Sequence, residues 1–143
     1  MRFTLHDLLL EIDVDKTKRL CCEWDEARDG CDCAGCRNYR LAAETFPPEV
    51  RAFFRELGLD EKKPTEVFPW HAEDGGRALH YGGFYHLCGT IVKGSGRYDV
   101  ADGYSVAFTD DISLPEEHLP SPALQMEIDF CGVPWLLEEK DPY

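Results

Sequence analysis

In Leu124-Gln125-Met126-Glu127-Ile128-Asp129-Phe130, apolar and polar side chains alternate along the whole length. Successive side chains of a strand point to opposite faces, so the four apolar side chains share one face. A strand with one apolar and one polar face is typical of an antiparallel sheet that is covered on one side. The stretch therefore predicts a strand of such a sheet.

The stretch from Pro48 to Leu57 predicts an amphipathic helix that covers this sheet. Proline suits the first helical position, and the glycine at position 58 suits the left-handed position that follows a helix. The apolar side chains fall at i, i+3, i+4 and i+7 and so form one stripe: Val50, Phe53, Phe54 and Leu57. We expect Phe53, Phe54 and Leu57 to pack on the apolar face of residues 124–130.

The other patterns predict further strands and one more helix. The helix is expected over Gly35–Thr45, with Asp32 as its N-cap. Alternating side chains predict two strands, Phe3–Val14 and Arg19–Glu23, joined as a hairpin through a polar turn. Glycine pairs or charged turns separate the remaining strands, which are expected at Glu66–His71, Arg77–Tyr81, Phe84–Lys93 and Tyr104–Thr109.

Helices and strands are segregated along the chain rather than alternating, which favours an α+β fold. We expect a single domain over residues 1–143, with a mostly antiparallel sheet and two helices packed on one face. Pro69 lies inside an expected strand and indicates an edge or a bend. Gly82-Gly83 indicates a bulge or a close backbone approach, and a turn is expected at Glu73–Gly76.

The charge of the chain excludes some classes of partner. The sequence carries 28 acidic and 15 basic residues, a formal net charge of −13. A protein of this charge repels polyanions, so we expect no nucleic acid and no anionic membrane as a partner. A basic protein partner fits the charge, because opposite charges steer encounter. No apolar run is long enough for a transmembrane helix.

Seven cysteines and an N-terminus without signal-peptide features predict a cytoplasmic protein with reduced thiols. Cys31, Cys33 and Cys36 supply three of the four soft ligands of a tetrahedral zinc site. Cys22 is the favoured fourth ligand, with Cys21, His86 and Cys88 as alternatives. We expect Cys22, Cys31, Cys33 and Cys36 to hold a structural zinc ion, although three plain thiols would give the same pattern.

Two other functions are open at this stage. Cys33-Ala34-Gly35-Cys36 at a helix start is a redox motif, because the helix N-terminus favours the thiolate of the first cysteine. Alternatively, histidines and aromatic residues in the expected strands would line the pocket of a small-molecule enzyme: His71, His80, His86, Trp70, Tyr81 and Tyr85. The preferred interpretation is a non-catalytic binding module that a structural zinc ion stabilises.

Three motifs occur in a fixed order: Cys31-Asp32-Cys33-Ala34-Gly35-Cys36-Arg37-Asn38, Phe46-Pro47-Pro48-Glu49-Val50 and Tyr81-Gly82-Gly83-Phe84-Tyr85-His86. In these motifs the chain resembles a group of small uncharacterised bacterial proteins that carry a CxCxxCxN motif. The resemblance spans most of the chain. It implies a bacterial cytoplasmic setting and brings no activity with it.

Overall fold

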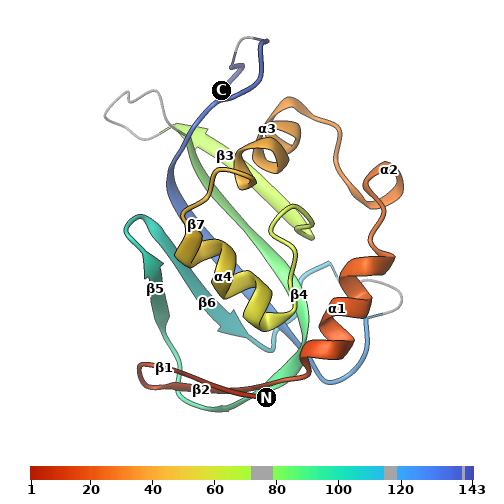
Figure 1. Ribbon diagram of the computed structural model, residues 1–143, viewed down its shortest axis with the longest axis vertical. Helices are drawn as coiled ribbons and strands as arrows, with labels where there is room; N and C mark the ends of the chain where they lie inside the picture. Colours follow the sequence, from red (N-terminus) through yellow and green to blue (C-terminus); the bar gives the residue numbers. More distant parts are fainter. Residues whose placement is uncertain (72–78, 115–118, 140) are drawn as a thin grey trace.

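The computed structural model describes residues 1–71, 79–114, 119–139 and 141–143 (Figure 1). The described helices are α1 (Val14–Glu23), α2 (Glu26–Asp29), α3 (Ala34–Ala43) and α4 (Pro48–Leu57). The described strands are β1 (Arg2–Leu5), β2 (Leu8–Ile12), β3 (Glu66–His71), β4 (Leu79–Lys93), β5 (Arg97–Ala101), β6 (Tyr104–Thr109) and β7 (Ala123–Val133). The structure is an α+β fold, as expected.

The sheet is organised around β4. Its strand order is β1-β2-β4-β7-β6-β5, and β3 also pairs with β4. The first half of β4 pairs with β3 and β7, and its last residues pair with β2. All the pairings between described strands are antiparallel, which confirms the sheet type that the alternation in β7 predicts.

Helices α3 and α4 pack on one face of the sheet, as expected (Figure 1). Tyr39 of α3 contacts Tyr81 of β4, with ring centroids 5.1 Å apart. Phe54 of α4 contacts Tyr85 of β4 at 4.9 Å and Phe130 of β7 at 6.4 Å. All five side chains are fully buried, so the stripe of α4 and the apolar face of β7 belong to one core.

Helix α4 has the bounds that the sequence predicts, and its four stripe residues are buried. Gly58 follows it with φ +86°, and the Leu59 N–H donates to the Phe54 carbonyl at 2.8 Å. A Cβ at position 58 would lie 2.6 Å from the Val14 carbonyl oxygen. Glycine is therefore required both by the backbone conformation and by the close approach of α1.

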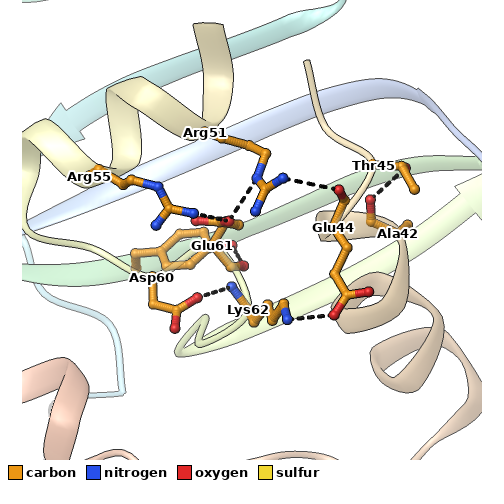
Figure 2. Close-up of polar contacts among 9 residues, drawn as sticks. Ala42, Glu44, Thr45, Arg51, Arg55, Asp60, Glu61 and Lys62 are labelled. Carbon is orange, nitrogen blue, oxygen red and sulfur yellow. Dashed lines mark hydrogen bonds and ion pairs between the residues drawn. The ribbon is translucent and has the colours of Figure 1, made fainter. Parts of the chain in front are cut away.

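A buried carboxylate ties α4 to the loop that follows it (Figure 2). Glu61 is 2% exposed, and its Oε1 lies 3.2 Å from Arg51 Nε and 3.6 Å from Arg55 Nη2. Arg51 also donates to the Glu44 carbonyl after α3. The Tyr85 hydroxyl donates to the Glu61 carbonyl, so this loop contacts both helices and the sheet.

The expectation for the N-terminal region is wrong in three respects. The stretch 3–14, expected as one strand, instead contains the two short strands β1 and β2 and the start of α1, and Arg19–Glu23 lies in α1 rather than in a strand. The hairpin therefore joins β1 to β2. Asp13 starts α1 by accepting from the Lys16 N–H, and the buried Thr17 bonds the Asp13 carbonyl and the Cys88 N–H. These cap contacts outweigh the short alternation that suggested a strand.

Two more segments differ from expectation. The charged loop at residues 25–30 contains the short helix α2, and β5 was not expected. The glycine pair does not interrupt β4, and it allows a close approach: a Cβ at Gly82 would lie 2.7 Å from the Phe68 ring, and one at Gly83 would lie 2.2 Å from the Glu66 carbonyl. The turn expected at Glu73–Gly76 lies outside the described residues.

β3 pairs with β4 and with no other strand among those described, which agrees with the edge position that Pro69 indicates. Its alternate side chains face opposite ways: Val67 is buried towards the helices, whereas Phe68 and Trp70 are 51% and 42% exposed on the other face. None of the described helices is long and apolar enough to cross a membrane.

Candidate metal centre

Three cysteine thiols converge at the start of α3. The Sγ atoms of Cys31, Cys33 and Cys36 all lie within 4.8 Å of one another. Cys31 and Cys33 are exposed, Cys36 is buried, and none of them forms a disulfide. Because zinc–thiolate bonds of about 2.3 Å in a tetrahedron place sulfur atoms about 3.8 Å apart, small side-chain rotations would bring the three thiols into the shell of a metal ion. The arrangement could hold a metal ion.

The local backbone holds the sulfur atoms in place. Cys33, not the expected Asp32, is the N-cap of α3, and its Sγ accepts from the Cys36 N–H at 3.5 Å. The Cys33 N–H in turn lies 3.5 Å from Cys31 Sγ. The Asp32 side chain points into solvent, 98% exposed. The sulfur atoms of Cys31 and Cys33 therefore both accept from backbone amides, and such hydrogen bonds favour the thiolate form.

Contacts with the sheet fix the first turn of α3. The Tyr81 hydroxyl donates to the Gly35 carbonyl at 2.6 Å, and the Gly35 N–H donates to the Tyr143 hydroxyl at 3.3 Å. A Cβ at Gly35 would lie 2.8 Å from the Pro69 ring, so α3 lies directly on β3. The Cys36 thiol lies 3.8 Å from the Val67 carbonyl of the same strand. The thiols are thus positioned by the sheet as well as by the turn.

The environment separates the pKa values of Cys33 and Cys36. Burial raises the pKa of Cys36, and the neighbouring thiols Cys33 and Cys31 raise it further. Partial burial also opposes ionisation of Cys33, but hydrogen bonds from the Cys36 amide and from the side chains of Cys31, Cys36 and Tyr143 lower its pKa below the ordinary value. Without a metal ion Cys33 therefore ionises before Cys36, whereas a bound cation would favour all three thiolates.

The thiols line a small cavity of about 230 Å³. Its walls come from α2, α3 and the chain leading into β3, and include Trp24, Arg40, Thr65 and Val67. Pockets for drug-sized organic ligands measure about 300–1,000 Å³. The volume therefore suits an ion or a few atoms of a partner better than a large substrate.

The expected fourth ligands lie elsewhere in the fold. Cys22 is exposed on α1 and is not among the thiols gathered within 4.8 Å at the start of α3. Cys21 is on the same helix, where burial raises its pKa to about 11. Cys88 and His86 are buried in β4, and His86 Nε2 lies 3.2 Å from Gln125 Oε1. The structure brings Cys31, Cys33 and Cys36 together, and a role for Cys22 as the fourth metal ligand stays a prediction.

The histidines and tyrosines of the expected enzyme pocket face different ways. Tyr81 and Tyr85 point towards the helices, where they contact Tyr39 and Phe54. His80 alternates with Tyr81 along β4 and contacts Trp70 on the opposite face of the sheet. His71 lies apart, with Nε2 3.0 Å from Asp141 Oδ2. The strand alternation therefore separates the tyrosines from His80 rather than gathering them in one pocket.

Sequence reasoning missed the residues that support the thiols from a distance. Tyr81, Pro69 and Tyr143 hold the first turn of α3, yet no local motif connects them with the cysteines.

Comparisons with protein-family models, with curated proteins and with solved structures found no match to this chain. The functional inference therefore rests on the thiol geometry, the charge and the burial described above.

Proposed function

We propose that Cys31, Cys33 and Cys36 bind one zinc ion as thiolates and that the protein is a non-catalytic binding module of the bacterial cytoplasm. The observation that carries the proposal is the convergence of three sulfur atoms within 4.8 Å on a short segment. Thiolates suit zinc because they are soft ligands, and two of the three sulfur atoms also accept from backbone amides.

Two of the three thiols, Cys31 and Cys33, are exposed, and a tetrahedral zinc ion needs a fourth donor beside the three. Water, Cys22 after a movement of α1, or a side chain of a bound partner would complete the tetrahedron. The net charge of −13 favours a basic protein partner over a nucleic acid. The small cavity at the thiols supports binding rather than turnover of an organic substrate.

Metal analysis of protein purified without a chelator tests this proposal. We expect Cys33→Ser to lose about one equivalent of zinc relative to the unaltered chain. Cys22→Ser is the matched control, because Cys22 is also exposed but lies outside the group. If Cys22→Ser loses the same equivalent, Cys22 is the fourth ligand. If Cys33→Ser keeps all its zinc, the proposal is wrong.

A second candidate function, thiol–disulfide exchange, is favoured by the asymmetry between Cys33 and Cys36. Cys33 is exposed with a lowered pKa, and Cys36 is buried with a raised one. The Cys33 thiolate would attack a partner's disulfide and release one partner thiolate. Cys36, after losing its proton, would attack the mixed disulfide and release the second partner thiolate, leaving a Cys33–Cys36 disulfide and a reduced partner.

The two candidate functions differ in what they require of purified protein. Thiol exchange predicts metal-free protein that reduces a model disulfide such as glutathione disulfide, with activity lost in Cys33→Ser. Zinc binding predicts one equivalent of metal and thiols that react only after the metal is removed. Less than about a tenth of an equivalent of metal, together with free Cys33 and Cys36, would favour exchange.

A further inference from the structure

A second group of metal-ligating side chains lies on the opposite face of the sheet. Ligand atoms of His80 on β4 and of Asp129 and Cys131 on β7 all lie within 4.8 Å of one another. His80 Nδ1 and Cys131 Sγ are 3.5 Å apart. His80 shares its face with Trp70 and not with Tyr81, which points towards α3. The group is therefore separate from the thiols at the start of α3.

A β-bulge creates this group. Tyr81 pairs with Phe130 and Leu79 pairs with Val133, so His80 alone lies opposite two residues, Cys131 and Gly132. Gly132 has φ +74°, although a Cβ there would meet no atom within 4 Å. The glycine thus serves the backbone conformation of the bulge and not a close contact. Bulges re-aim side chains, and this one turns the Cys131 thiol towards the imidazole.

We propose that His80, Asp129 and Cys131 form a second metal site, which takes a divalent ion of the zinc, cobalt and nickel type. Imidazole, thiolate and carboxylate are the ligands that such ions bind, and bonds of about 2.0–2.3 Å place tetrahedral ligand atoms about 3.3–3.8 Å apart. The separation of 3.5 Å between His80 Nδ1 and Cys131 Sγ already falls in this range.

The surroundings of the group define its charge and its open side. Arg97 Nη1 lies 4.0 Å from Asp129 Oδ2 and is a cation, among the described residues, with which a metal ion would compete. Asp129 and Cys131 are each partly exposed. Three protein ligands at a surface leave one position for water or for a donor atom of a small ligand. This site accordingly has the open coordination of a binding or catalytic metal centre rather than the closed shell of a structural one.

Trp70 provides a built-in reporter for the site. Its ring centroid lies 5.6 Å from that of His80. A paramagnetic ion held by the imidazole would quench the fluorescence of this indole more than that of Trp24, which follows α1, or of Trp135, which follows β7. The quenching can therefore be assigned by comparing the unaltered chain with Trp70→Phe.

Titration of the reduced full chain with Co²⁺ tests the proposal. In Cys33→Ser protein, which lacks a thiol of the first centre, we expect one equivalent of Co²⁺ with a sulfur-to-cobalt charge-transfer band and quenching of tryptophan fluorescence. His80→Ala or Asp129→Asn added to this background should weaken binding at least about tenfold, since each removes a ligand. Cys131→Ser should also abolish the charge-transfer band, and Trp70→Phe should remove most of the quenching but keep the equivalent.

The outcomes separate this site from the zinc site proposed above. If only the site at Cys31, Cys33 and Cys36 fails to bind metal, the Co²⁺ equivalent that depends on His80 should still bind, both in the unaltered chain and in Cys33→Ser. In the chain with all its cysteines, His80→Ala should lower the bound Co²⁺ by one equivalent, a measurement that does not depend on the folding of Cys33→Ser. If no equivalent is lost with His80→Ala or with Cys131→Ser, the pair is only a hydrogen bond and the proposal is wrong.

Discussion

Helix α4 buries four apolar side chains in the core, whereas the segment from residue 24 to residue 34 buries none. Local hydrogen bonds hold that segment: Asp25 accepts from the Ala27 N–H, and Asp29 accepts from the Asp25 N–H. Exposed hydrogen bonds contribute little net stability, because water competes for the same groups. Burial therefore fixes α4, whereas local hydrogen bonds and the Glu26–Arg40 ion pair at 3.0 Å hold the segment before α3.

Phe54→Ala should have the largest effect on stability. Phe54 is fully buried between Tyr85 and Phe130, and removing its ring loses transfer free energy and leaves a cavity. We expect the free energy of unfolding to fall by about 3–5 kcal/mol, measured by denaturant titration. The control is Leu41→Ala on α3, where the side chain is 41% exposed; it should change stability by less than about 0.5 kcal/mol. Equal effects would mean that α4 is not anchored by burial.

Glu61→Gln should have an intermediate effect. The change keeps the shape of the buried side chain but weakens its contacts with Arg51 and Arg55. Since the guanidinium groups are 37% and 62% exposed, they regain water, and we expect a loss of about 1–2 kcal/mol. Glu44→Gln is the control, because its ion pair with Lys62 is exposed at both ends and should matter less. A more stable Glu61→Gln protein would mean that desolvation of the carboxylate outweighs its pairing.

Metal removal should loosen the thiol-bearing segment and leave α4 unchanged. We expect a chelator to speed amide hydrogen exchange at residues 24–36 by at least about tenfold, because the segment has no buried side chain before Gly35 to hold it. Exchange of the α4 amides is the internal reference. Equal acceleration in both regions would show that the metal stabilises the whole fold, and no change in either would argue against a bound metal.

The smallest effect is expected on thiol reactivity, with no change in stability. The pKa of Cys33 is lowered despite partial burial, because the Cys36 amide and neighbouring side chains donate to its sulfur, whereas burial raises the pKa of Cys21 to about 11. As pH falls, the Cys33 thiolate therefore persists below the pH at which an ordinary thiol is protonated. In metal-free protein, alkylation of Cys33 by iodoacetamide should level off at a lower pH than alkylation of Cys21, as peptide mass spectrometry would show. The reverse order would contradict the environments described for the two thiols.

A region of this fold is predictable from sequence where the residues that determine its structure lie close together along the chain. Helix α4 is predictable because its cap and its apolar stripe lie within a dozen residues. The grouping of Cys31, Cys33 and Cys36 is predictable too, because the three cysteines are neighbours in the sequence. Helix α1 differs from the expected strand because only Thr17 is buried in it, so no long apolar stripe marks the helix. The alternation of apolar residues at positions 20–24 then resembled a strand.

Cys22 and His80 show where sequence reasoning reaches its limit. The choice of Cys22 as a fourth ligand assumed a strand beside the cysteines, and α1 replaces that strand. His80 meets Cys131 only because β4 pairs with β7 and because one extra residue on β7 shifts the register. The bulge brings together two residues that are 51 positions apart in the sequence, and it leaves no pattern in either segment by itself. Long-range register is thus the part of this fold that periodicity does not encode.

The central place of β4 has a consequence for the chain as it leaves the ribosome. The four described helices and the strands β1–β3 are synthesised before β4, and β7 is completed only at Val133. At about 5–20 residues per second, residues 79–133 take roughly 3–10 s to be made. During that time the aromatic faces of α3 and α4 have no sheet to cover, so a nascent chain paused before β4 should be a chaperone substrate and a chain released there should aggregate.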